Sequence, residues 1–298
     1  MNAIEIKGLT KNFGAKQALS GLNMTVPEGA IYGFIGENGS GKSTTEKIIC
    51  GLIKPSGGTI KLFGRDYTDK DVRASVGVLI EAPGCFSNMT VWNNLLLQAA
   101  NLDIKDAKKE VGRVLKMVRM EGAASNKYKN CSLGMKQRIG IAMALLGNPR
   151  LLVLDEPING LDADGMRIMR EVLLDVTKNG TSVVVSSHIL GELEKIATHY
   201  GIVRGGKMIK EMTAKELEDS CRTYIALQAT EMERAKMLLG CKYSRVELDE
   251  KGYIRIYDMV EPEDVVLYLY ENKIIVKEID KDKIGLEEYY IDLMKEGK

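Results

Sequence analysis

The sequence has little of several residue types whose abundance would point to a particular class of protein. It holds one Trp, four Phe and two His among 298 residues, and its 42 Lys and Arg are balanced by 41 Asp and Glu. A net charge of +1 gives no basic footprint for nucleic acid, so no nucleic-acid partner is expected. Apolar residues nevertheless make up 45% of the chain, which predicts an ordinary folded core rather than disorder.

Long apolar runs are also missing. No stretch approaches the length that spans a bilayer, and residues 1–6 lack the basic and apolar segments of a signal peptide. We therefore expect any membrane role to come through a partner. The cysteines are few, odd in number and without the spacing of a metal site, which favours reduced thiols in the cytosol; they are Cys50, Cys85, Cys131, Cys221 and Cys241.

One stretch carries a specific chemistry. Residues 36–44 match the phosphate-binding pattern G-x-x-x-x-G-K-[ST], between an apolar strand-like segment (30–35) and a helical one (42–52). In that context backbone N–H groups and a helix N-terminus converge on phosphates. Lys42 is expected to reach the β- and γ-phosphates, and Ser43 to ligate Mg²⁺. The chain is therefore predicted to bind a nucleoside triphosphate through Asn38, Gly39, Ser40, Gly41, Lys42, Ser43 and Thr44.

Two carboxylates follow a second apolar strand, Leu151 to Asp155. Continuous apolarity predicts a strand buried on both faces of a parallel sheet, and such sheets place ligand chemistry at the strand tips. Asp155 suits a carboxylate associated with Mg²⁺, and Glu156 suits a residue that orients the attacking water. Alone, the pair could be a solvated turn; beside a P-loop, the functional interpretation is favoured.

Two further residues have open interpretations. His188 ends another apolar strand that begins at Thr181, so it is either structural or a sensor of the γ-phosphate. Phe13, upstream of the P-loop strand, is either an aromatic that stacks on adenine or an ordinary core or edge residue.

The order of patterns predicts an α/β P-loop fold with two domains, residues 1–220 and 221–298. Strands at Ile4–Leu9 and Asn23–Val26 would form an antiparallel part, and helical spacing marks an inserted helical subdomain at about 85–147. Residues 130–134 interrupt that spacing, so the next helix is expected from Met135. The tail reads β-α-β-β-α-β, a small α+β ferredoxin-like unit without a catalytic constellation.

With these motifs in place, residues 1–215 resemble an ATP-binding subunit of an ABC transporter. Residues 36–44 match its Walker A loop, 151–155 its Walker B strand and 159–162 its D-loop. The resemblance implies that Phe13 stacks on adenine, that Glu156 is the general base and that His188 is the switch histidine. Cys131 to Met135 stands in the place of the LSGGQ signature.

Two departures from that family pattern are visible. Glu81 replaces the usual Gln, and a carboxylate there would bind Mg²⁺ more strongly but adds charge beside the γ-phosphate. In the signature, Leu133 and Met135 replace a Gly and the Gln, whereas Ser132 and Gly134 can still meet a γ-phosphate held by the opposite subunit. Both departures resemble the subgroup that serves bacitracin-type and lantibiotic-type peptide resistance.

The resemblance implies a peripheral subunit on the cytoplasmic side of the membrane. It would bind ATP and Mg²⁺, form a homodimer on nucleotide binding and energise export by a separate integral membrane permease. The alternative is a soluble ABC-type ATPase of translation or DNA repair, but those proteins usually carry paired cassettes or a long coiled coil. A P-loop kinase would leave the signature stretch and His188 unexplained.

Overall fold

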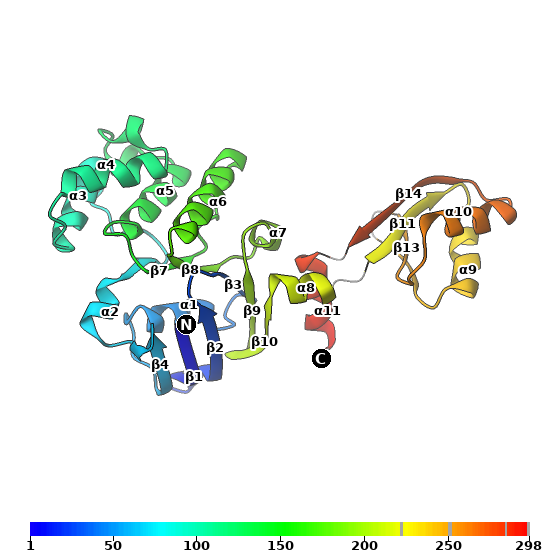
Figure 1. Ribbon diagram of the computed structural model, residues 1–298, viewed down its shortest axis with the longest axis horizontal. Coiled ribbons are helices and arrows are strands. Elements are labelled where there is room, and N and C mark those ends of the chain that lie inside the picture. The colour runs from blue at the N-terminus through cyan, green and yellow to red at the C-terminus, as the bar shows by residue number, and fades with distance from the viewer. Residues whose placement is uncertain (221–222, 250–251, 284, 297–298) are drawn as a thin grey trace. The chain divides into compact units, whose positions relative to one another are not determined.

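A computed structural model of the chain describes residues 1–220, 223–249, 252–283 and 285–296. Their contacts divide the chain into two compact units, Met1–Ala214 and Lys215–Lys298 (Figure 1). The division thus falls slightly before the boundary expected after residue 220. Cys221, the first residue of the expected second domain, lies outside the described residues.

The first unit is built on a six-stranded sheet in the order β10-β9-β3-β8-β7-β6. Five strands run parallel, and only the edge strand β10 is antiparallel to its neighbour. Every residue of β3, β7 and β8 is buried, which explains why these strands read as unbroken apolar runs. The strands are β3 (Ile31–Ile35), β6 (Val76–Leu79), β7 (Leu151–Asp155), β8 (Ser182–Ser186), β9 (His199–Arg204) and β10 (Lys207–Thr213).

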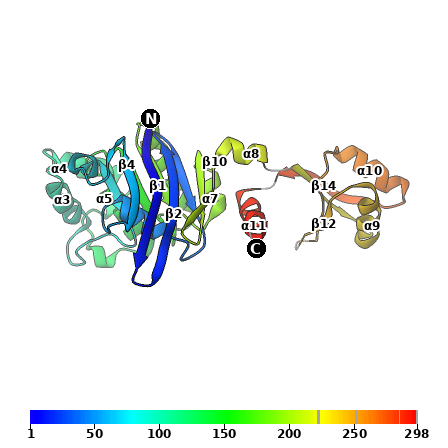
Figure 2. The same cartoon turned by 90° about the horizontal axis from the view of Figure 1, so that it is seen from below.

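A four-stranded antiparallel sheet in the order β2-β1-β4-β5 forms a second layer of this unit (Figure 2). Its strands are β1 (Asn2–Phe13), β2 (Lys16–Pro27), β4 (Gly57–Leu62) and β5 (Arg65–Asp66). Helix α1 (Lys42–Ile49) contacts both β2 and β7, so it lies between the two sheets. One hydrophobic cluster joins Ile6 and Leu22 of this sheet to Ile48 of α1 and Val153 of β7.

A helical block is inserted between β6 and β7, as expected (Figure 1). It contains α3 (Val91–Asn101), α4 (Ala107–Met117), η1 (Glu121–Ala123), η2 (Tyr128–Asn130) and α5 (Leu133–Ala144). The remaining helices of this unit are α2 (Lys70–Ala74), α6 (Ala163–Lys178) and α7 (Leu190–Glu194).

Three details of the first unit differ from the sequence-based expectations. Helix α5 begins at Leu133 rather than Met135, because the Ser132 hydroxyl accepts a hydrogen bond from the Met135 N–H and caps the helix. The β1–β2 hairpin is much longer than expected, since the pairing continues to Phe13 and Lys16 with bulges or irregularities along it. Helix α2 was not expected, and Asp69 caps it.

The second unit has its own antiparallel sheet in the order β12-β13-β11-β14. This is the order of a ferredoxin-like unit and confirms the α+β prediction for the tail. Ile225, Leu239 and Leu269 belong to a hydrophobic cluster distinct from that of the first unit. The elements are α8 (Ala214–Ser220), which crosses the division, and β11 (Thr223–Ala229), α9 (Met232–Lys242), β12 (Val246–Leu248), β13 (Ile254–Ile256), α10 (Pro262–Glu271), β14 (Val276–Lys283) and α11 (Leu286–Glu296).

In the part of the chain that the structure describes, no helix combines the length and the apolar character that crossing a membrane requires.

Because the two hydrophobic clusters share no residue, we predict that a chain ending at residue 220 folds and binds ATP with an affinity close to that of the full chain. Calorimetric titration with ATP would measure the affinity, and circular dichroism would establish the fold. A truncated protein that is folded but does not bind ATP would contradict the separation.

Candidate active site

The loop between β3 and α1 is shaped by its glycines. Gly39 and Gly41 have φ values of 80° and 112°, in the left-handed region that other residues rarely adopt. A Cβ on Gly36 would lie 2.4 Å from the carbonyl oxygen of Val203, and one on Gly41 would lie 2.7 Å from Leu19 Cδ2. Only glycine therefore permits this close approach of the loop to its neighbours.

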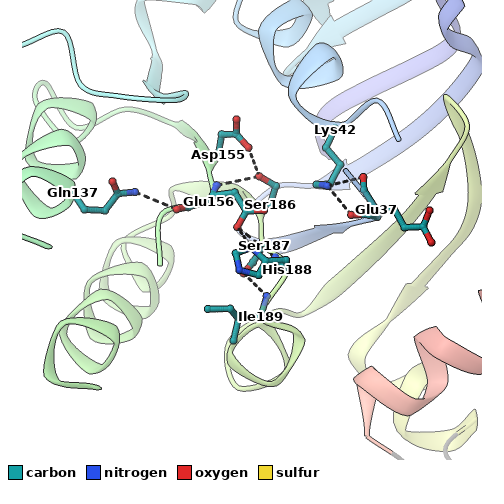
Figure 3. Close-up of polar contacts among 10 residues, drawn as sticks. Glu37, Lys42, Gln137, Asp155, Glu156, Ser186, Ser187, His188 and Ile189 are labelled. Carbon is teal, nitrogen blue, oxygen red and sulfur yellow. Dashed lines mark hydrogen bonds and ion pairs between the residues drawn. The ribbon is translucent and has the colours of Figure 1, made fainter. Parts of the chain in front are cut away.

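This loop has the features of a phosphate site. The Lys42 ammonium donates to the carbonyl oxygens of Gly36 and Glu37 at 2.6 and 3.2 Å, so it lies over the loop (Figure 3). The Ser40 hydroxyl is buried and has no hydrogen-bond partner among the described residues. A buried cation, an unpartnered hydroxyl and the first N–H groups of α1 fit the phosphates of a nucleotide.

The predicted acidic residues lie at the same edge of the sheet. Strands β7 and β8 are parallel neighbours, with Asp155 paired to Ser186, so both strands end together. The buried Ser186 hydroxyl donates to Asp155 Oδ1 at 2.8 Å. The carboxylate of Asp155 is thereby fixed beside the loop, and with the Ser43 hydroxyl it offers the hard oxygen ligands that Mg²⁺ prefers.

Glu156 is held on three sides. Its N–H lies 3.2 Å from both the carbonyl and the hydroxyl oxygen of Ser186, and its carboxylate lies 2.7 Å from His188 Nδ1 (Figure 3). The His188 N–H points to the same carboxylate oxygen at 3.4 Å. Lys42 begins the helix that follows β3, Asp155 ends β7, and Glu156 and His188 follow β7 and β8. The four residues come together because β3, β8 and β7 lie side by side in one sheet.

A buried carboxyl group that the sequence reading missed lies behind this cluster. The Glu46 side chain on α1 is fully buried, and neither carboxyl oxygen has a hydrogen-bond partner among the described residues. Burial, followed by the charge of Asp155, raises the pKa of Glu46 well above its ordinary value of 4.5. Helical spacing was the available signal, since Glu46 is one turn from both Lys42 and Ile49 on the inward face.

Glu81 lies on the segment that follows β6. Its backbone is left-handed, with φ 64°, and its carboxylate pairs with the Lys47 ammonium of α1 at 2.6 Å. The hydrogen bond and the charge of Lys47 lower the pKa of Glu81. The side chain is therefore ionised and is anchored beside the P-loop helix, although 72% of its surface remains exposed.

The two predicted signature residues begin helix α5. Ser132 is exposed, and its oxygen accepts from the Met135 N–H, which leaves its own O–H free to donate outward. Gly134 packs near Leu161, which belongs to the predicted D-loop. Phe13 ends β1 with half of its surface exposed and with the Lys11 ammonium 4.8 Å from its ring centroid.

Comparison with known proteins settles the family. The family described as ABC transporter matches residues 19–159. The bacitracin transport ATP-binding protein BcrA of Bacillus licheniformis is 36% identical over 300 residues, which cover 99% of this chain and 98% of BcrA. The chain belongs to the ABC transporter ATP-binding proteins. The lantibiotic transport ATP-binding protein SrtF of Streptococcus pyogenes is 37% identical and covers 70% of this chain and 90% of SrtF.

Solved structures agree. One described as an ATP-binding subunit of an ABC transporter has a TM-score of 0.67 at 28% identity and covers 73% of this chain and 92% of its own. A dimeric ATP-binding cassette in a post-hydrolysis state with ADP and Pi has a TM-score of 0.63 at 25% identity and covers 71% of this chain and 98% of its own.

The fold class and the resemblance to the bacitracin and lantibiotic subgroup are therefore confirmed. This ABC subunit binds ATP and is an ATPase that energises a transporter. A soluble ATPase of translation or DNA repair is not favoured.

The buried Glu46 gives a prediction about stability and pH. Its raised pKa means that the unfolded chain loses this proton at lower pH than the folded one, so the group weakens the fold as pH rises above 4.5. Replacing Glu46 with Leu should raise the free energy of unfolding by about 1–3 kcal/mol near neutral pH, because the unpartnered buried oxygens are removed. The gain should shrink as the pH falls through 4.5, because below it both states of the wild type hold the proton.

Urea unfolding at several pH values would measure this difference. Glu121→Leu, at an exposed glutamate of the helical block, is the control and should show no comparable dependence on pH. If the difference in the free energy of unfolding between Glu46→Leu and the wild type fell as pH rose from 4.5 to 7, the prediction would be contradicted.

Proposed function

We propose that the cluster around Glu156 hydrolyses ATP in this subunit and that each nucleotide is shared by two copies of the chain. The observation that carries the proposal is the convergence of Lys42, Asp155, Glu156 and His188 at one edge of the sheet. Phe13 stacks on adenine, and the P-loop N–H groups of residues 38–44 hold the phosphates. Ser43 and Asp155 would hold Mg²⁺, which supplies positive charge to the β- and γ-phosphates when it is bound.

Glu156 orients the attacking water and accepts its proton. The 2.7 Å contact with His188 Nδ1 fixes the carboxylate, and the left-handed backbone at Glu156 turns the side chain out of the line of β7. His188 thus has two roles in the proposal: it holds Glu156 and it contacts the γ-phosphate. Lys42 stabilises the charge that develops on the transferred phosphoryl group.

The signature residues act on the other copy. The Ser132 hydroxyl and the Gly134 N–H lie at the N-terminus of the 12-residue helix α5, where a negative charge is stabilised. A γ-phosphate held by the opposite subunit would meet both groups. A dimeric cassette among the related structures supports the pairing of two copies. We propose that the γ-phosphate promotes closure and that loss of the cleaved phosphate allows the copies to separate.

The transported molecule is proposed to be an antimicrobial peptide of the bacitracin or lantibiotic type, exported by a separate integral membrane permease. The two relatives named for bacitracin transport align with this chain over almost their whole length, and the alignment includes the C-terminal unit of this chain. The ATPase would bind the permease from the cytoplasmic side of the membrane.

A groove of about 330 Å³ between β6 and the helical block, lined by Leu79, Pro83 and Met143, is the proposed docking place for the permease. Phe86 is 60% exposed and follows the Glu81 segment closely, so we include it in this contact.

The central test of the catalytic assignment is Glu156→Gln. The amide keeps the shape of the side chain but cannot take a proton, so turnover should fall by at least about 100-fold. ATP binding should persist, because Lys42 and the P-loop are unchanged, and the unhydrolysed nucleotide should stabilise a dimer. Phosphate release and size-exclusion chromatography with ATP would measure both effects. Wild-type turnover would remove Glu156 from the catalytic role.

Glu81 provides a second test, because it is proposed to ligate Mg²⁺ in place of an amide. Its carboxylate must leave Lys47 to do so. The Glu81 carboxylate repels the γ-phosphate unless the metal screens the two charges, whereas a neutral amide does not. The ATPase rate should therefore depend more steeply on the Mg²⁺ concentration in the wild type than in Glu81→Gln.

Lys47→Met is the matched variant for that test. It frees Glu81 from its ion pair and should lower the Mg²⁺ concentration at half-maximal rate. Superimposable Mg²⁺ titrations of all three proteins would mean that Glu81 is not at the metal.

A further inference from the structure

Gln137 is a buried amide that connects the signature helix to the catalytic segment. It lies in the second turn of α5, and 9% of its surface is exposed. Its Nε2 donates to the backbone carbonyl oxygen of Glu156 at 3.2 Å (Figure 3). The amide therefore holds the main chain of Glu156 from the side opposite to Ser186, which binds the N–H of the same residue.

The backbone of Glu156 needs such support. Its φ of 50° is left-handed, a conformation that is unfavourable for a non-glycine residue unless its surroundings impose it. Apart from Gln137, the Glu156 carbonyl accepts only the short-range turn bond from the Asn159 N–H at 3.1 Å among the hydrogen bonds of the described residues. Gln137 thus ties the carbonyl of this strained residue to helix α5, whereas Ser186 of β8 holds its N–H.

Apolar packing joins the same two segments. A Cβ on Gly160 would lie 2.5 Å from Leu133 Cδ2, and a Cβ on Gly134 would lie 3.3 Å from Leu161 Cδ2. Each leucine therefore rests on a glycine of the other segment. Leu133 is the residue that replaces a signature glycine, so its side chain provides packing that a glycine at that position would lack. The start of α5 and residues 156–161 are held together at three points.

We propose that Gln137 is a positioning residue that sets the orientation of Glu156 according to the position of the signature helix. The inference rests on the proposed function, in which Ser132 of this helix contacts the nucleotide of the opposite copy. Docking of α5 on that nucleotide would then fix Glu156 in the chain's own site, so that each site becomes competent when the other is engaged. Gln137 touches no reacting atom and acts through the Glu156 backbone.

The test compares Gln137→Met and Gln137→Glu, which keep the side-chain length but remove the donor, with the wild type. We expect kcat to fall about 10–100-fold, as for other groups that orient a catalytic residue, while KM stays within about twofold. ATP-dependent dimers should still form on size-exclusion chromatography. Lys136→Met, which places the same new side chain on the neighbouring position facing Tyr128, should keep the wild-type kcat.

A double variant separates positioning from general stability. If Gln137 acts only through Glu156, adding Gln137→Met to Glu156→Gln should not lower the residual turnover further. A further multiplicative loss in the double variant would overturn the inference, as would a Gln137→Met protein that loses ATP-dependent dimers along with its thermal stability. If Gln137→Met kept the wild-type kcat while Glu156→Gln was inactive, the role of Gln137 would be overturned but the proposed function would stand. Wild-type turnover in Glu156→Gln would overturn both.

Discussion

The parallel pairing of β7 with β8 is the constraint on which the site depends. Because these strands are in register, Asp155 and Ser186 end side by side, and the Ser186 side chain and backbone hold both acidic residues. Both strands are buried on both faces, and this burial stabilises the pairing. Helix α1 and the antiparallel sheet pack on one side, and α6 contacts β8. The chemistry is therefore fixed by packing that reaches the centre of the first unit.

Most of the charged side chains in this small region have a nearby polar or charged partner. Glu156 is beside His188, Glu81 is beside Lys47, and Lys42 lies over the carbonyl oxygens of the loop. Glu46 is the exception: among the described residues its buried carboxyl oxygens have no hydrogen-bond partner, and burial and the nearby charge of Asp155 raise its pKa. In the proposed function, three of these arrangements change when a triphosphate binds: Lys42 would exchange its present partners for phosphate, Glu81 would exchange Lys47 for the metal, and His188 would gain a second contact.

Much of the fold and of the site could be predicted from the sequence, because both depend on local patterns. Unbroken apolar runs gave β3, β7 and β8, and the residues after them gave the P-loop, Asp155, Glu156 and His188. Ser186, Glu46 and Gln137 were missed as site residues, since their importance arises from cross-strand register and helix packing, which no local pattern records. The start of α5 was misplaced because a Ser cap and a Gly resemble an interruption when helical spacing alone is counted.

The most direct test of the shared site is a mixing experiment with two inactive variants. Lys42→Ala disables the P-loop of its own chain but leaves Ser132 intact, whereas Ser132→Arg leaves the P-loop intact and disables the signature. If each nucleotide is held by the P-loop of one copy and the signature of the other, a mixed dimer contains one complete site. An equimolar mixture should regain ATPase activity above that of either variant alone. Random pairing sets an upper limit of about a quarter of the wild-type rate, and the rate should stay below it because the Ser132→Arg chain cannot use its own signature helix to orient its Glu156. A mixture no more active than the separate variants would contradict the shared site.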